Sequence, residues 1–297
     1  MSEANASVDR KTIAKALLGF VLAGIVLYLF GRVIGWNEIL RALGSAKLAW
    51  VAAACASSAL CLLVWSRSWD VILDLLGVEI PWRSLVPTYF AATFADYVTP
   101  FGKAGGSPFI AYVLSTDDRA NYQESLAGVV TADLLNLLPF FTFAGVGFVA
   151  LVVQNRVPQG ARGLIVGLAI LAVAMPLLLY LSYRKRDFVE GLVVKAVGPI
   201  AKRTGRVDAE GIRGRVDGFY DRIDVISGHP RTIAQTLVYA FVGWVLFAAP
   251  LYLSGRALGV TIDPLIVLFI VPASTLAGIT PTPGGLGGVE AAIVGLL

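Results

Sequence analysis

Uninterrupted apolar runs of about 20 residues constrain this sequence more than any other feature. A helix of that length crosses a hydrocarbon core of ~30 Å, whereas a membrane-spanning β-strand needs only about 10 residues of alternating polarity. Because the runs do not alternate, we predict an all-α integral membrane protein. The predicted spans lie near residues 12–34, 48–76, 124–153, 163–183 and 232–254.

The composition agrees with a membrane protein and excludes several other classes. Hydrophobic residues make up 57% of the 297 residues and charged residues 15%, against roughly 45–50% and about 25% in soluble domains. This balance argues against a disordered chain and a nucleic-acid-binding protein. The two cysteines, Cys55 and Cys61, point to different faces of one apolar helix, and His229 is the single histidine. We therefore expect no metal site and no cofactor.

The positive charge is concentrated in one loop. Of the 24 Lys and Arg residues, 11 fall within residues 184–231, so the positive-inside rule predicts that this loop is cytoplasmic. Counting spans back from it places the N-terminal tail, residues 1–11, in the cytoplasm of a plasma-membrane protein. Apolar residues recur at helical spacing between Ile212 and Ile226. They indicate an amphipathic helix on the membrane surface, or a solvated connector that only fixes the topology.

Two segments of similar construction interrupt the apolar pattern. Residues 99–108 read Thr-Pro-Phe-Gly-Lys-Ala-Gly-Gly-Ser-Pro, and residues 280–290 read Thr-Pro-Thr-Pro-Gly-Gly-Leu-Gly-Gly-Val-Glu. In each, an apolar helix stops at Thr-Pro, passes a glycine-rich break and resumes. The arm 88–98 would be about 16 Å long, which reaches only the midplane of the membrane. The predicted hinge residues are Pro100, Pro108, Pro281 and Pro283.

Irregular backbone at membrane depth must line a cavity or be buried in protein, so the two breaks predict two re-entrant hairpins, 87–114 and 264–297. The first repeat, 12–153, then has three crossings. This odd number inverts the second repeat, 154–297, so the hairpins enter from opposite sides and their tips meet. The second repeat lacks its third crossing, and we expect the chain to be truncated after Leu297. Alternatively, Gly and Pro only allow close packing.

Ionisable residues at this depth are candidates for function. Helix N-termini near Gly106 and Gly288, together with Lys103, suit a phosphate or carboxylate. The predicted head-group site comprises Lys103, Gly105, Gly106, Gly284, Gly285, Gly287 and Gly288. A coupling proton or cation is predicted to bind at Asp96, Asp133 and Glu290.

Other interpretations of these charges stay open. Lys103 could simply neutralise Asp96 or Glu290 as a counter-ion. Arg67 and Asp70, one helical turn apart, form an interfacial pair whose charges snorkel to water, or they contact a ligand.

The two glycine-rich motifs resemble those of the lysylphosphatidylglycerol synthase transmembrane family, a flippase-like membrane domain, and the resemblance runs over residues 12–297. It implies movement of modified phospholipids or lipid-linked sugars between leaflets. Relatives carry the domain alone, beside an aminoacyl-lipid synthetase domain or beside a glycosyltransferase domain. No soluble catalytic domain lies within this sequence, so lysyl transfer is not carried over.

We therefore expect a transporter, not an enzyme, that moves a phospholipid or a polyprenyl-phosphate-linked saccharide between leaflets. The alternative is a non-transporting membrane partner or scaffold for a glycosyltransferase or lipid-modifying enzyme. An intramembrane enzyme is a third possibility. The expected partners are a membrane lipid and a membrane-associated glycosyltransferase, with no nucleic acid.

Overall fold

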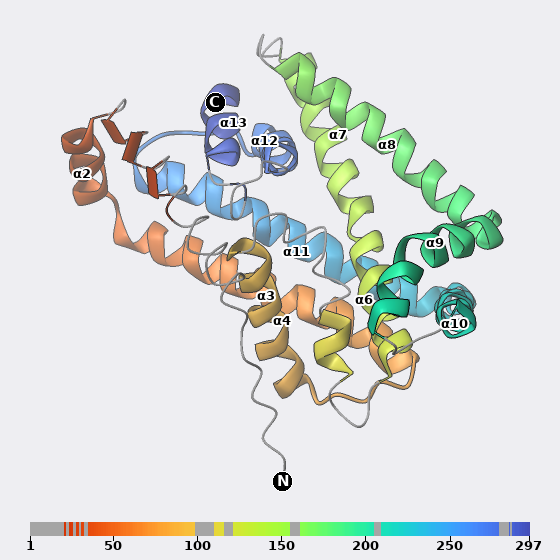
Figure 1. The fold of residues 1–297 in the computed structure, drawn as a ribbon. Coiled ribbons are helices and arrows are strands. Elements are labelled where there is room, and N and C mark those ends of the chain that lie inside the picture. The colour runs from red at the N-terminus through yellow and green to blue at the C-terminus, as the bar shows by residue number, and fades with distance from the viewer. Residues whose placement is uncertain are drawn as a thin grey trace.

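The computed structural model describes the chain from Val21 onward with gaps, and every regular element in the described part is a helix (Figure 1). The residues not described are 1–20, 22–23, 26–27, 30, 33–34, 99–109, 116–120, 155–160, 205–208, 279–284 and 286. The helices are α2 (Trp36–Ser45), α3 (Leu48–Leu75), α4 (Trp82–Val98), α6 (Tyr122–Leu135), α7 (Leu137–Val153), α8 (Ala161–Arg184), α9 (Arg186–Thr204), α10 (Ala209–Ser227), α11 (Pro230–Ala257), α12 (Pro264–Ala277) and α13 (Gly288–Leu296).

Four helical stretches are long and apolar enough to cross a membrane, and they confirm four of the predicted spans. They are Leu48–Leu75, Tyr122–Val153, Ile165–Arg184 and Pro230–Ala257. The predicted span 12–34 lies mostly outside the described residues, although its described positions from Val21 to Arg32 are helical. The second stretch bends at Asn136 between α6 and α7, because Pro139 has no N–H for the carbonyl of the preceding turn.

The centre of the molecule is an antiparallel pair, α3 and α11, each of 28 residues (Figure 1). The Ser57 hydroxyl donates to the Leu246 carbonyl at 2.8 Å, and the Cys61 thiol donates to the Gly243 carbonyl at 3.3 Å. At the end of the pair, the Lys47 N–H donates to the Ala257 carbonyl at 3.0 Å. The residue numbers rise along α3 as those of their partners fall along α11, so the two helices pack antiparallel. The inverted repeat itself stays a prediction.

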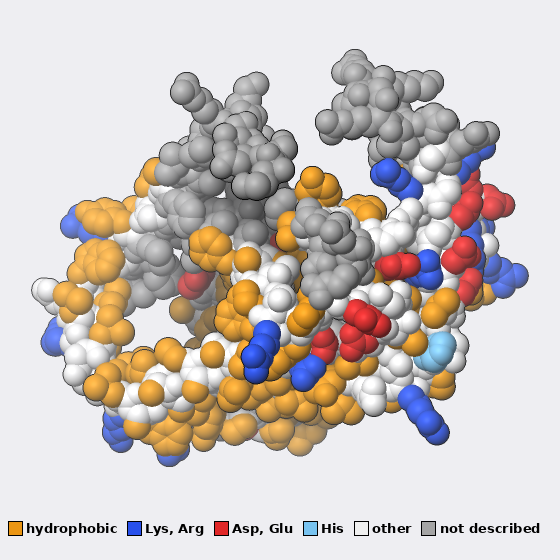
Figure 2. Space-filling model, turned by 90° about the horizontal axis from the view of Figure 1, so that it is seen from below, with side chains coloured by type: hydrophobic (Ala, Val, Ile, Leu, Met, Phe, Trp, Pro, Cys, Tyr) orange, Lys and Arg blue, Asp and Glu red, His pale blue; other side chains and the backbone are white. Residues whose placement is uncertain are grey.

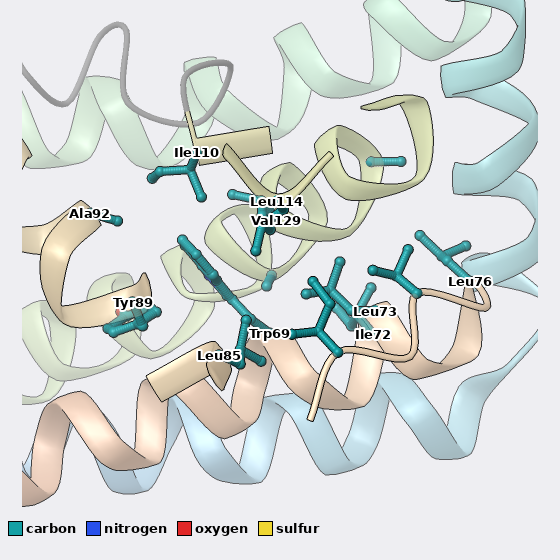
Figure 3. Packing of buried hydrophobic residues seen from close by; sticks show 14 of the residues in the cluster. Trp69, Ile72, Leu73, Leu76, Leu85, Tyr89, Ala92, Ile110, Leu114 and Val129 are labelled. Atoms are coloured by element: carbon teal, nitrogen blue, oxygen red, sulfur yellow. The ribbon is translucent and has the colours of Figure 1, made fainter. Parts of the chain in front are cut away.

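Each broken hairpin contributes both of its described arms to one core. In the first core, α4 and the helical residues 110–114 pack with α3 and α6 around Trp69, which lies among Leu85, Tyr89 and Val129 (Figure 3). In the second core, α12 and α13 pack with α7 and α11. The arms of each hairpin therefore lie together, while their re-entry from opposite membrane sides stays a prediction.

The first arm is longer than the sequence predicts. Helix α4 begins at Trp82, six residues before the expected start, and its 17 residues measure about 26 Å instead of about 16 Å. The Pro81 carbonyl accepts hydrogen bonds from the N–H groups of Ser84 and Leu85, which starts the helix early. Pro87 interrupts one bond within it without ending it.

Helix α10 packs against α6, so it is not a fully solvated connector. Tyr220 and Ile226 are only 5% and 2% exposed, and Ile226 belongs to the core around Trp69. The Arg222 guanidinium pairs with the Glu124 carboxylate of α6 at 2.8 Å. Protein thus buries the end of the apolar stripe at Ile226 and partly covers Val216, Phe219 and Ile223. Contact of this helix with a membrane surface stays a prediction.

Candidate functional site

One of the predicted coupling residues, Asp133, takes part in a polar contact between two spans. Asp133 of α6 accepts a hydrogen bond from the Trp69 indole N–H of α3 at 3.3 Å. The Trp69 ring packs edge-on against the ring of Tyr89 of α4, with centroids 4.6 Å apart. Helices α3 and α6 therefore hold Asp133, one of the three predicted coupling residues, beside Trp69. A joint role for Asp96, Asp133 and Glu290 stays a prediction.

Asp133 lies within one of the four stretches that are apolar enough to cross a membrane, eleven residues after its first residue, Tyr122. Trp69 and Tyr89 are 4% and 8% exposed, so both rings fill the core, and the polar end of Trp69 faces the Asp133 carboxylate. Carboxylates within membrane-spanning helices are costly, and such positions mark ion or substrate pathways by default.

A second charged group links α3 to the start of α4. Arg67 is ion-paired with Asp70, and its guanidinium lies 4.3 Å above the ring of Trp82. The Trp82 indole N–H donates to the Ser66 hydroxyl at 3.3 Å. The side chain of Asp70 is only 8% exposed, against 43% for Arg67. Asp70 is therefore covered by protein while Arg67 is partly exposed. Whether the pair lies at the membrane interface or contacts a ligand stays a prediction.

The described part of the second break is shaped by glycine backbone. Gly285 and Gly287 have φ of 72° and 88°, the left-handed region that favours glycine. A Cβ on Gly285 would overlap the Cα of Gly278 at the end of α12. The Gly287 N–H donates to the Glu290 carboxylate at 2.7 Å, which caps α13 where it begins at Gly288. Glu290 thus has a local structural role, while a coupling role for it stays a prediction.

We expect Gly285→Ala to destabilise the second hairpin. The left-handed backbone alone costs a non-glycine residue about 1–2 kcal/mol, and the added methyl group also meets the backbone of Gly278. Gly295→Ala in α13 is the matched control, because a Cβ there has no neighbour within 4 Å. Thermal unfolding of the purified variants in detergent measures the difference. Equal midpoints for the two variants would contradict the close approach.

Several predicted site residues lie outside the described part of the chain, so their arrangement stays a prediction. They are Pro100, Lys103, Gly105, Gly106, Pro108, Pro281, Pro283 and Gly284. The sequence interpretation missed Trp69, which donates to Asp133, and Tyr89, whose ring packs against Trp69. Within the described residues, no three His, Cys, Asp or Glu side chains gather closely enough to hold a metal ion.

Four helical stretches that are apolar enough to cross a membrane, packed against one another, define a polytopic α-helical membrane protein. The family model described as "Lysylphosphatidylglycerol synthase TM region" matches residues 16–297, so the chain belongs to this family.

Similar proteins carry only a general name. Two UPF0104 membrane proteins of Methanothermobacter thermautotrophicus are 26% and 24% identical to this chain, covering 94% and 97% of it and 84% of each relative. A UPF0104 membrane protein of Pyrococcus horikoshii is 23% identical, covering 77% of this chain and 70% of the relative. No solved structure gave a significant match.

Proposed function

We propose that this protein moves a phospholipid or a lipid-linked saccharide between the two leaflets of the membrane. The observation that carries the proposal is Asp133, a carboxylate within a membrane-spanning stretch that accepts a hydrogen bond from the Trp69 indole of a neighbouring span. A protein that only needed to reside in the membrane would have no reason to bear this cost. Membership of the transmembrane-region family supports the same class of function.

The carboxylates are suited to energetic coupling. Uptake of a proton or a cation changes the charge of a carboxylate, and at Asp133 it changes the acceptor of the hydrogen bond from Trp69. Asp96 lies two residues before the end of α4, which leads into the first glycine-rich break. In the proposed cycle, a change of charge at Asp96 and Asp133 alters how α4 packs on α3 and α6. The break beyond α4 then moves with it.

The glycine-rich breaks are the proposed binding site for the phosphate of the lipid. Lys103 and the backbone N–H groups near Gly106 and Gly288 supply positive charge and donors for it. Orientation is part of the proposal: the basic segment that contains α9 and α10 lies on the cytoplasmic side of the plasma membrane, as does the N-terminus.

Transport can be measured in proteoliposomes with fluorescent phospholipids and fluorescent polyprenyl-phosphate saccharides, using a reagent that bleaches only the outer leaflet. We expect the protein to accelerate exchange of one of these classes. Asp133→Asn is expected to slow that exchange at least tenfold, because it removes the carboxylate that faces Trp69. Asp217→Asn, on the exposed face of α10, should leave the rate unchanged.

Two outcomes would contradict the proposal. If lipid exchange is equally fast in Asp133→Asn, the Asp133 carboxylate takes no part in the mechanism. If neither lipid class exchanges while the protein binds a membrane-associated glycosyltransferase, the protein is a scaffold for that enzyme. Unfolding midpoints of both variants, measured in the same detergent, show that lost transport does not reflect lost folding.

A further inference from the structure

Helix α9 exposes a stripe that is both apolar and basic. A single residue, Lys185, separates the end of α8 at Arg184 from the start of α9 at Arg186. The stripe runs along one face at spacings of three and four residues and consists of Lys185, Phe188, Leu192 and Lys195. Phe188 and Leu192 are 69% and 57% exposed, and both lysines are exposed as well. Large apolar side chains in this position need a cover that the described protein does not supply.

The opposite face of α9 is turned toward the protein. Val189, Glu190 and Val193 are half-buried, and the Glu190 carboxylate pairs with the Arg213 guanidinium of α10 at 2.9 Å. This packing fixes which face of α9 points outward. It also neutralises Glu190, so Asp187 is the acidic residue that stands exposed beside the stripe.

Hydrogen bonds to α10 fix the junction between α8 and α9. Asp224 of α10 accepts hydrogen bonds from the Tyr183 hydroxyl at 2.6 Å and from the Arg186 guanidinium at 3.0 Å. The hydrogen bond from Tyr183, and then the bond from Arg186, hold the pKa of Asp224 below its ordinary value. The Tyr220 hydroxyl donates to the Ser182 carbonyl at 3.0 Å. Helix α9 therefore leaves the end of α8 in a defined direction.

The stripe continues the apolar surface of a membrane span. The last turns of α8 expose Leu177, Leu178 and Tyr180 by 52%, 59% and 54%, on a span whose outer surface is apolar. Tyr180 and Tyr183 stand at its end, where aromatic residues anchor a helix at the membrane–water interface. Figure 2 shows that charged side chains of both signs gather at the end of the molecule where α9 and α10 lie.

We propose that α9 lies in the head-group layer and binds anionic phospholipids of its leaflet. Phe188 and Leu192 insert below the phosphates, and Arg184, Lys185 and Lys195 contact the phosphates from their flexible stems. Three exposed basic residues against one exposed acidic residue favour an anionic over a zwitterionic surface. The role of a membrane-surface helix, which the sequence pattern suggested for residues 212–226, is thus proposed for α9. The inference does not depend on transport.

Depth is tested with an environment-sensitive fluorophore on single cysteines at position 188 or 192, in full-length protein with Cys55→Ala and Cys61→Ala, reconstituted into nanodiscs. Position 217 on α10 carries the control label, because Asp217 is exposed there. We expect blue-shifted emission at 188 and 192, and iodide quenching several-fold weaker there than at 217. Quenching as strong at 188 and 192 as at 217 would overturn the proposal.

Charge is tested by thermal unfolding in nanodiscs of phosphatidylcholine with and without phosphatidylglycerol. We expect phosphatidylglycerol to raise the midpoint of the native protein. The Lys185→Gln/Lys195→Gln variant should lose most of this rise while keeping its midpoint in pure phosphatidylcholine. Arg215→Gln, an exposed change on α10, should keep the rise. A rise of equal size in the double-lysine variant would show that the anionic lipid acts elsewhere and would refute the assignment.

Discussion

Gly147→Ala is expected to destabilise this protein more than any other exchange of one glycine for alanine within α7. Gly147 packs against α12, and a Cβ there would overlap the backbone nitrogen of Phe269 and lie 2.8 Å from the carbonyl carbon of Leu268. Backbone atoms cannot rotate aside as a side chain can, so α12 must shift as a whole. We expect a loss at or above the ~3 kcal/mol upper end typical of overpacked cores.

Gly145→Ala is the matched control for this prediction. It lies two residues away on the same helix, where a Cβ meets no atom within 4 Å, so the change adds a methyl group without a clash. Thermal midpoints in one detergent, followed by tryptophan fluorescence, measure both variants. If Gly147→Ala unfolds at the same temperature as Gly145→Ala, α7 and α12 are not in backbone contact.

Arg67→Met is expected to cost about 3 kcal/mol, whereas Asp70→Asn should cost clearly less. Removing Arg67 leaves the carboxylate of Asp70, whose side chain is 8% exposed, without its counter-charge in a buried site. Removing the charge of Asp70 leaves Arg67 cationic, but its side chain is 43% exposed and still stacks on Trp82. The asymmetry follows from where the two charges lie.

The double variant Arg67→Met/Asp70→Asn isolates the cost of the unpaired carboxylate. It should recover most of the stability that Arg67→Met loses, because no buried charge remains. Unfolding midpoints of the two single variants and the double variant complete the cycle. A double variant no more stable than Arg67→Met would mean that Arg67 stabilises through its contact with Trp82 and not through Asp70.

The spans were predictable because a membrane imposes a length and a polarity on each helix, and apolar runs record both. The contacts among them were not predictable in this way. Trp69 and Asp133 are 64 residues apart in the sequence, and no local pattern pairs them.

The amphipathic segments show a second limit. Helical spacing of apolar residues in α10 predicts a covered face but does not say whether lipid or protein covers it. Here α6 and the core around Trp69 supply the cover, and α9 is left with exposed Phe188 and Leu192. By contrast, the cap on α13 was readable locally, since Glu290 stands three residues after Gly287.

The in-register pairing of α3 and α11 has a mechanical consequence. If one helix slid along the other, the hydrogen bonds from Ser57 and Cys61 would break together. The Trp65 ring would also lose its close packing against Gly243, which has no side chain. The two helices are therefore expected to stay fixed relative to each other while other helices move. In the proposed cycle, rearrangement is left to the arms around it, α4 before the first break and α13 after the second.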